Sequence, residues 1–336
     1  MPNLMITYRC NLHCAYCFAN SYVNRWDTDM TVETAGRVLD WLKAGNGKMV
    51  GIMGGEPTVH PQLDDILMMA FKRGMRCSIF TNGLALHQHL DAASAVGARL
   101  LINVNEPHVL GEKLVKRLEA TLDTIEKRGM MPQVTFGMNI YHTDYDYSYH
   151  LALLKRYSQH EIRVSVAVPN NPDPGMSVLS SLKAFVPDVV RLYQELAEID
   201  AFPYFDCNRL PACLLRKEVR EALGTLPETG CRSNLWEGAV PCQPVIDILP
   251  DETAIRCFGL SNETRVRIAD FQTPNHLRRH YAAYIDALGM FAPPSDACRS
   301  CYEHQTGLCQ GGCLVYRMGE ILSKRKAVWD QGGRMK

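Results

Sequence analysis

Three cysteines near the start of the chain are the residues with the clearest chemical potential. Cys10, Cys14 and Cys17 are spaced as C-x3-C-x2-C and follow a short apolar run that ends at Tyr8. Closely spaced thiolates in a chain without an export signal bind metal more often than they form disulfides. An iron–sulfur cubane takes four ligands, so three local cysteines leave one iron free to bind a small molecule. A structural zinc site is the alternative, and it would need a fourth protein ligand.

The composition is that of a globular protein without a strong electrostatic field. Its 336 residues include 36 basic and 36 acidic side chains, and 46% of the residues are hydrophobic. The zero net charge argues against nucleic acid or an anionic membrane as the main partner. No signal peptide and no apolar run of membrane-spanning length is present. We therefore expect a cytoplasmic protein whose 13 cysteines serve metal binding rather than disulfides.

Short apolar runs alternate with amphipathic stretches through the first half of the chain. The apolar runs predict strands over 4–8, 49–53, 76–80, 99–105, 133–140 and 163–168. Helical periodicity predicts helices over 31–44 (capped by Thr31), 62–73, 87–96, 112–128, 148–158 and 180–199. Six such repeats imply parallel strands with crossover helices, so we predict an α/β fold with a partial (β/α)6 barrel, similar to a TIM barrel.

Polar turns follow the predicted strands at one end of this barrel. Gly54-Gly55-Glu56-Pro57 follows the second strand, Asn103 and Asn105 end the fourth, and Asn139 ends the fifth. Parallel α/β folds place their chemistry at the C-terminal ends of the strands. These residues and the three cysteines are therefore expected to face one active site. The aromatic segment 141–150 is expected on a loop above it, either lining a substrate pocket or exposed to solvent.

The order and spacing of these two motifs resemble the radical S-adenosylmethionine (SAM) superfamily over residues 4–170. The resemblance implies that Cys10, Cys14 and Cys17 hold a [4Fe–4S] cluster whose open iron binds SAM. It further implies SAM-binding roles for eight residues. Gly54 and Gly55 allow close backbone approach, and Glu56 lies near the methionyl ammonium. Tyr16 lies against the adenine and Val168 borders the adenine pocket, while the ribose and carboxylate are contacted by Asn103, Asn105 and Asn139. The alternatives are a turn residue for Glu56 and polar strand caps for the asparagines.

Nine further cysteines follow residue 200, where helical periodicity fades. They are Cys207, Cys213, Cys231, Cys242, Cys257, Cys298, Cys301, Cys309 and Cys313. The segment Val245–Cys257 predicts a hairpin that presents its last cysteine. This half resembles the SPASM domain, the extension that binds auxiliary [4Fe–4S] clusters in many radical SAM enzymes.

Three features depart from the SPASM pattern. Glu252 stands where the pattern has glycine, the final C-x2-C-x7-C-x3-C run has a longer middle gap, and no cysteine follows Cys313. Cys207 and Cys213 lie upstream and are candidates to replace the missing ligand. Nine cysteines suffice for two four-cysteine clusters. One auxiliary cluster, or a pair of zinc sites, are the alternatives.

Two domains are predicted from this division. Residues 1–200 form the radical SAM partial barrel, and residues 201–336 form a small, irregular, cysteine-rich auxiliary cluster domain. The turn-rich segment Asn170–Gly175 is expected near their junction.

The resemblance implies an oxidoreductase that reductively cleaves SAM to a 5′-deoxyadenosyl radical and abstracts hydrogen from a substrate. SPASM-type members mostly act on ribosomally made peptides or protein side chains, so we expect a peptide maturase that forms a cross-link, oxidises or epimerises. A dehydrogenase or epimerase of a small molecule, such as an amino sugar or a cofactor or tetrapyrrole precursor, is the alternative. A non-enzymatic electron-transfer protein is disfavoured, because Gly54–Pro57 would then have no role.

Two partners follow from the same resemblance. SAM cleavage needs a low-potential electron donor of the flavodoxin or ferredoxin type. Many peptide maturases carry an N-terminal leader-binding domain, and the chain has no room for one before Cys10. A separate leader-peptide-binding protein is therefore expected for a peptide substrate, unless the substrate is recognised without a leader.

Overall fold

A single curved sheet organises the chain in the computed structural model. The model describes residues 1–167, 178–205, 210–211, 213–214, 242, 245–288, 295–306, 309, 311–315, 318 and 321. Within these residues the sheet has ten strands, in the order β10-β9-β8-β1-β2-β3-β4-β5-β6-β7. Seven neighbouring strands are parallel: β1 (Asn3–Met5), β2 (Met49–Met53), β3 (Arg76–Thr81), β4 (Arg99–Asn103), β5 (Val134–Ile140), β6 (Glu161–Val166) and β7 (Phe202–Phe205).

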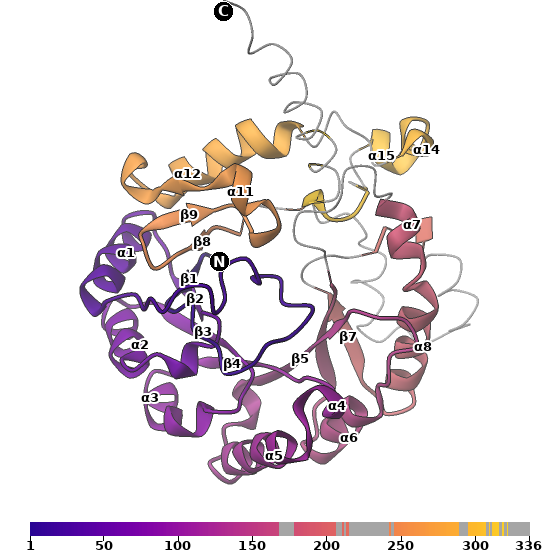
Figure 1. The fold of residues 1–336 in the computed structure, drawn as a ribbon, viewed down its shortest axis with the longest axis horizontal. Coiled ribbons are helices and arrows are strands. Elements are labelled where there is room, and N and C mark those ends of the chain that lie inside the picture. The colour runs from indigo at the N-terminus through magenta and orange to yellow at the C-terminus, as the bar shows by residue number, and fades with distance from the viewer. Residues whose placement is uncertain are drawn as a thin grey trace, which may run out of the picture.

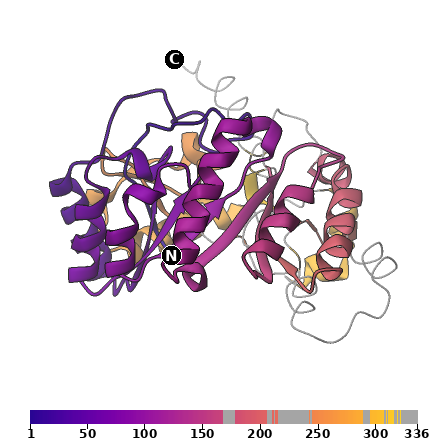
Figure 2. The same ribbon diagram turned by 90° about the horizontal axis from the view of Figure 1, so that it is seen from below.

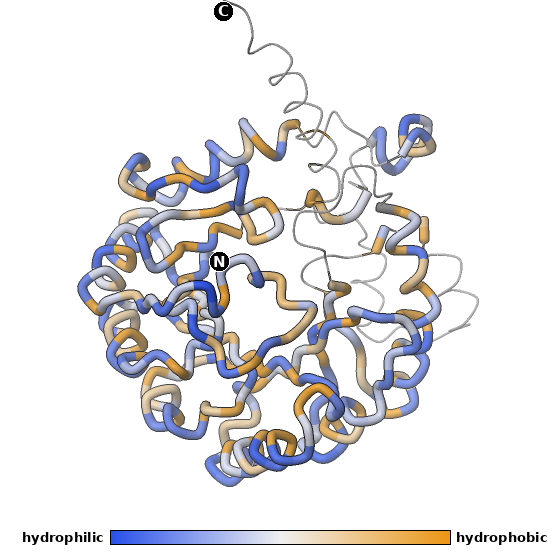
Figure 3. The backbone as a smooth tube through the Cα atoms, viewed as in Figure 1, coloured by the Kyte–Doolittle hydropathy of each residue, from blue (hydrophilic) through white to orange (hydrophobic). Residues whose placement is uncertain are grey.

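Helices cover the outer face of this sheet, which curves into an open ring (Figure 1, Figure 2). They are α1 (Val32–Ala44), α2 (Leu63–Lys72), α3 (Leu90–Ala95), α5 (Glu112–Lys127), α6 (Ser148–Arg156) and α8 (Val186–Ala197). Both hydrophilic and hydrophobic residues line each outer helix (Figure 3), and in α1 the inner stripe of Val38, Leu39 and Leu42 is completely buried. Thr31 caps α1 by accepting the backbone N–H of Thr34. The predicted partial barrel is confirmed.

The helix predicted over 180–199 is wrong in one respect, because the chain forms two helices there. These are α7 (Val178–Lys183) and α8, which begins with Pro187 in its first turn. Proline lacks the N–H that would bond to the residue four positions earlier, and its ring collides with that residue's carbonyl. A continuous helix therefore stops before Pro187, whereas the start of a new helix accepts it.

A hairpin from the second half of the chain extends the barrel sheet. It consists of β8 (Asp247–Ile248) and β9 (Thr253–Ile255), which pair antiparallel as predicted, and β10 (Val266–Arg267) follows beside β9. The prediction missed that β8 also pairs, in parallel, with β1. Glu252 in the hairpin turn has a φ of 61°, a left-handed conformation that favours glycine. Glycine adopts this conformation without strain, which is a physical reason for the glycine that the SPASM pattern has at this position.

No helix among the described residues is both long and apolar enough to cross a membrane. The predicted junction at Asn170–Gly175 lies outside the described residues.

Asp247 is a buried acid at the contact between the hairpin and the barrel. Its side chain accepts a hydrogen bond from Asn3 Nδ2 at 2.8 Å, and burial raises its pKa to about 7. Below about pH 4 this carboxyl is protonated in both the folded and unfolded states. Between about pH 4 and that raised pKa only the folded state keeps the proton, so the free energy of unfolding falls as the pH rises through this window.

We expect Asp247→Asn to be more stable than the unmodified chain at pH 8, by about 2–4 kcal/mol, and to lose most of this advantage at pH 4. The amide keeps an acceptor for Asn3 without a charge to desolvate. Urea unfolding of both proteins at the two pH values measures the difference. Asp251→Asn is the control of opposite sign, because hydrogen bonds from Thr253 and the charge of Arg265 lower the pKa of the half-exposed Asp251, so its replacement should not stabilise the chain at pH 8. A stability difference that does not change with pH would contradict the assignment.

Candidate functional site

The cysteine triad lies on a loop that follows β1 and is folded back by one asparagine. Asn24 Oδ1 accepts the backbone N–H of Cys10 at 2.8 Å, and the Asn24 N–H donates to the Tyr8 carbonyl at 2.8 Å. Asn24 has a φ of 56°, which asparagine tolerates better than most residues. The Leu12 N–H points at Cys10 Sγ at 3.4 Å. Backbone donors aimed at a sulfur favour its thiolate form.

The Gly-Gly-Glu turn after β2 packs directly on this loop. The Gly55 N–H donates to the Thr7 carbonyl and the Glu56 N–H donates to the Arg9 carbonyl, both at 2.8 Å. A Cβ on Gly55 would lie 2.4 Å from the Arg9 carbonyl oxygen and 2.9 Å from Cys10 Cβ. The two motifs are therefore in backbone contact, and this contact leaves no room for a side chain at Gly55.

Glu56 is a buried carboxylate that ties this turn to the end of β3. Its Oε1 accepts the N–H and the hydroxyl of Thr58, at 3.1 and 2.6 Å, and the hydroxyl of Thr81 at 2.6 Å. Its Oε2 accepts the Asn82 N–H at 2.7 Å. Burial raises the pKa of Glu56. Oε1 thus receives three hydrogen bonds and Oε2 receives one, so Oε2 is the oxygen with acceptor capacity left for a further donor.

The donor set of the triad fits an iron–sulfur cluster better than zinc. Burial raises the pKa of Cys10 to about 12 and raises those of Cys14 and Cys17. Within the described residues, the ligand atoms of Glu106, His108 and His142 converge within 4.8 Å, and the three sulfurs do not. Sulfurs bound to one zinc lie at most about 4.6 Å apart, given bonds of about 2.3 Å. A cubane binds each thiolate at a different iron and needs no such convergence.

The strand-end asparagines form one connected group with the triad. Asn105 Oδ1 lies 3.6 Å from Cys14 Sγ and accepts the Tyr16 hydroxyl. Asn103 Nδ2 lies 3.4 Å from the same hydroxyl, and Asn103 Oδ1 accepts Asn139 Nδ2 at 2.8 Å. The structure thus places these asparagines and Tyr16 together beside a predicted cluster ligand.

Two further residues bear on that group. Ser165, on β6, donates to Asn139 and was missed, although it lies on a predicted strand. Val168 lies outside the described residues.

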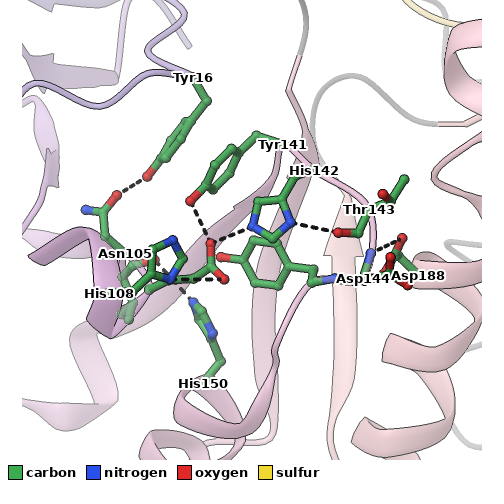
Figure 4. Close-up of polar contacts among 12 residues, drawn as sticks. Tyr16, Asn105, His108, Tyr141, His142, Thr143, Asp144, His150 and Asp188 are labelled. Carbon is green, nitrogen blue, oxygen red and sulfur yellow. Dashed lines mark hydrogen bonds and ion pairs between the residues drawn. The ribbon is translucent and has the colours of Figure 1, made fainter.

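Glu106, directly after these asparagines, was also missed as a site residue. Its Oε2 accepts the Tyr141 hydroxyl at 2.7 Å and lies 3.1 Å from His142 Nε2, while His142 Nδ1 lies 2.8 Å from the Thr143 carbonyl (Figure 4). The Tyr141 ring stacks on Tyr16 with centroids 4.4 Å apart. The carboxylate is almost fully buried. The rule that placed Asn105 at a strand end would have included its neighbour.

The loop that carries Tyr141 is packed rather than solvated. Tyr145 and Tyr147 are each 1% exposed, and the backbone N–H groups of Asp144 and Tyr145 donate to the Asp188 carboxylate at 3.2 and 3.0 Å (Figure 4). His150 donates to the Val104 carbonyl at 3.2 Å. The interpretation of 141–150 as a solvent-exposed aromatic loop is therefore wrong for its central tyrosines.

His142 has acceptors at both ring nitrogens, and this arrangement predicts a measurable shift. The Thr143 carbonyl and the Glu106 carboxylate raise its pKa, because both stabilise the doubly protonated ring. We expect Glu106→Gln to lower the pKa of His142, since the variant removes the negative charge. NMR titration of histidine labelled with ¹³C at Cε1 measures this. His89, which pairs with Asp64 at 2.7 Å, is the internal control, and an unshifted His142 would contradict the prediction.

Six of the seven described cysteines of the second half fall into two groups. In the first, burial and then the nearby thiols of Cys309, Cys298 and Cys301 raise the pKa of Cys213. The Gly311 N–H points at Cys309 Sγ at 3.3 Å.

In the second group, Cys242 and Cys257 flank the guanidinium of Arg256. Cys313 is buried. Cys207 and Cys231 lie outside the described residues.

Comparison with known proteins shows what the barrel is similar to. Residues 4–154 match the Radical SAM superfamily model. Fe-coproporphyrin III synthase of Methanosarcina barkeri is 29% identical over 85 residues, 25% of this chain and 21% of that protein. PqqA peptide cyclase of Ruegeria pomeroyi is 30% identical over 93 residues, 27% of this chain and 25% of that protein. The matches thus span about a quarter of these curated relatives.

The fold likeness extends further along the chain. The structure of Streptococcus suis SuiB bound to S-adenosylmethionine matches with a TM-score of 0.62 at 18% identity and covers 93% of this chain and 72% of SuiB. SuiB bound to the precursor peptide SuiA matches with a TM-score of 0.60, at 18% identity over 93% of this chain and 71% of SuiB. At this identity the match shows a shared fold.

Proposed function

Because residues 4–154 match the radical SAM superfamily model, we propose that this chain is a radical SAM oxidoreductase that modifies a peptide. One observation carries the proposal: the Gly-Gly-Glu turn contacts the cysteine loop through a backbone approach that a Cβ on Gly55 would block, 2.4 Å from the Arg9 carbonyl. The family binds a [4Fe–4S] cluster and SAM, and this contact holds the two corresponding motifs together.

We assign the cofactor residues as follows. Cys10, Cys14 and Cys17 hold the first cluster, which supplies the electron for reductive cleavage of SAM when both are bound. The Glu56 Oε2, with its remaining acceptor site, receives the methionyl ammonium. Tyr16, Asn103, Asn105 and Asn139 contact the nucleoside and carboxylate of SAM, which requires their present hydrogen bonds to one another to be exchanged for bonds to SAM.

The auxiliary clusters follow from the grouping of the remaining cysteines. We assign one [4Fe–4S] cluster to Cys213, Cys298, Cys301 and Cys309. The other three thiols raise the pKa of Cys213, and those of Cys298 and Cys301 raise the pKa of Cys309. The upstream Cys213 thereby replaces the ligand that the SPASM pattern has beyond Cys313. Cys242 and Cys257 are assigned to a second cluster, with Cys313 and the remaining cysteines as candidates for its other ligands.

A peptide substrate is supported by the cysteine-rich second half and by the similarity to PqqA peptide cyclase. The alternative, oxidation or epimerisation of a small molecule, is supported by the similarity to Fe-coproporphyrin III synthase. For the peptide substrate we further propose two partners, a flavodoxin- or ferredoxin-type electron donor and a separate leader-peptide-binding protein.

Two measurements on the anaerobically reconstituted chain test the proposal. Incubation with SAM and a reductant should release 5′-deoxyadenosine, and its absence would reject the enzyme. Iron should reach about twelve atoms per chain for three cubanes, whereas about eight would leave one auxiliary cluster. Mass spectrometry of short peptides encoded beside the gene, after co-expression with this chain, distinguishes the peptide substrate from the small molecule.

A further inference from the structure

Arg256 is a completely buried arginine between two predicted cluster ligands. It follows β9, precedes Cys257 directly, and its side chain is 1% exposed. Burying a guanidinium is costly unless its charge and its donors find partners. The identity of those partners therefore indicates what the residue does.

Each nitrogen of the guanidinium has an acceptor nearby. Nε donates to the Asp286 carboxylate, and Nη2 donates to the Cys242 carbonyl at 2.6 Å. Nη2 also lies 3.4 Å from Cys242 Sγ, and Nη1 lies 3.9 Å from Cys257 Sγ. One edge of the guanidinium thus faces a carboxylate and the other faces two sulfurs.

The buried guanidinium faces one carboxylate, on Asp286, and two sulfurs that are anionic when they bind a metal. Asp286 can neutralise the arginine in the absence of metal, although its side chain remains 21% exposed. Cluster ligands are thiolates, and a [4Fe–4S] core with its four thiolates carries a net negative charge. The buried positive charge therefore matches a cluster at Cys242 and Cys257 better than it matches two neutral thiols.

We propose that Arg256 sets the reduction potential of the auxiliary cluster bound by Cys242 and Cys257, through N–H···S contacts to both ligand sulfurs and through its positive charge. The inference rests on the proposed function, which assigns these cysteines to a cluster. Reduction adds one electron and makes the cluster more negative, so nearby donors and positive charge stabilise the reduced form and raise the potential. A raised potential suits a cluster that takes up an electron during a substrate oxidation.

The test is a potentiometric titration of the reconstituted full-length chain, followed by EPR of the reduced clusters. Arg256→Gln should make the potential of one cluster more negative and leave the others unchanged. Arg256→Lys keeps the charge but has fewer donors in a fixed geometry, so it should give a smaller shift in the same direction. Arg265→Gln is the matched control, because Arg265 pairs with Asp251 and lies over the Tyr22 ring.

A second variant covers the case in which Arg256→Gln loses the cluster altogether. Asp286→Asn keeps the arginine and removes the carboxylate that partly neutralises its positive charge. The cluster then experiences more positive charge, so its reduction potential should become less negative. Unchanged potentials in both the arginine and the aspartate variants would overturn the inference. An unmodified chain with iron for the first cluster alone would instead overturn the auxiliary-cluster part of the proposed function, and the inference with it.

Discussion

Replacing Gly55 with alanine is expected to abolish SAM cleavage. The new Cβ would lie 2.4 Å from the Arg9 carbonyl oxygen and 2.7 Å from the Arg9 carbonyl carbon. These are backbone atoms next to Cys10, so the loop that carries the first cluster ligand must move away from the turn. We expect 5′-deoxyadenosine release to fall at least about a hundredfold, which corresponds to about 2.7 kcal/mol, and iron to fall by up to about four atoms per chain.

Gly36→Ala is the matched control. Gly36 lies within α1, and a Cβ there would meet Met69 Sδ at 3.3 Å, an atom of a flexible side chain that can yield. Alanine also favours a helix over glycine by about 1 kcal/mol. This variant should keep its iron and its SAM cleavage. Normal SAM cleavage by Gly55→Ala would show that the contact between the two motifs does not position the cluster.

Replacing Cys213 with alanine is expected to remove or open one auxiliary cluster while the first cluster remains. The thiol of Cys213 lies with those of Cys309, Cys298 and Cys301, so its loss takes away the fourth ligand of that group. Iron should fall by about one to four atoms per chain, and the EPR signal of one reduced cluster should change or disappear. Release of 5′-deoxyadenosine should persist, because the triad lies on a different loop.

Cys77→Ala is the control for this experiment. Cys77 lies on β3, is 2% exposed, and belongs to the hydrophobic core. Its replacement should cost some stability by leaving a small cavity, with no loss of iron. Full iron and an unaltered spectrum in Cys213→Ala would reject Cys213 as a ligand.

The barrel was predictable from the sequence because its signals are local. Each strand is a short apolar run, and each outer helix buries a stripe with helical periodicity. The placement of the Gly-Gly-Glu turn and the cysteine loop at the same end of the barrel was also expected, because parallel strands bring their C-terminal ends to one edge. Pro187 divides the last predicted helix and was a visible local signal for a break. The prediction of one continuous helix gave more weight to the periodicity of the flanking residues.

The features that were missed depend on pairings between distant parts of the chain. Asn3 and Asp247 lie 244 positions apart in the sequence, and no local sequence pattern indicates that β8 pairs with β1. Arg256 looks like an ordinary polar residue of a hairpin until the fold buries it beside Cys242 and Asp286. Glu106 is a different case: its place directly after Asn105 was a local signal, and only its contacts with Tyr141 and His142 depend on the fold.

The pairing of β1 with β8 has a consequence for how the chain is made on the ribosome. β1 leaves the ribosome early and can pair with β2 once Met49–Met53 has also emerged, but its other neighbour begins at Asp247. Until then β1 is an edge strand, and exposed edges invite pairing with other chains. At three residues, β1 offers a newly made neighbour little to pair with, and its shortness protects the nascent protein until the hairpin closes that edge.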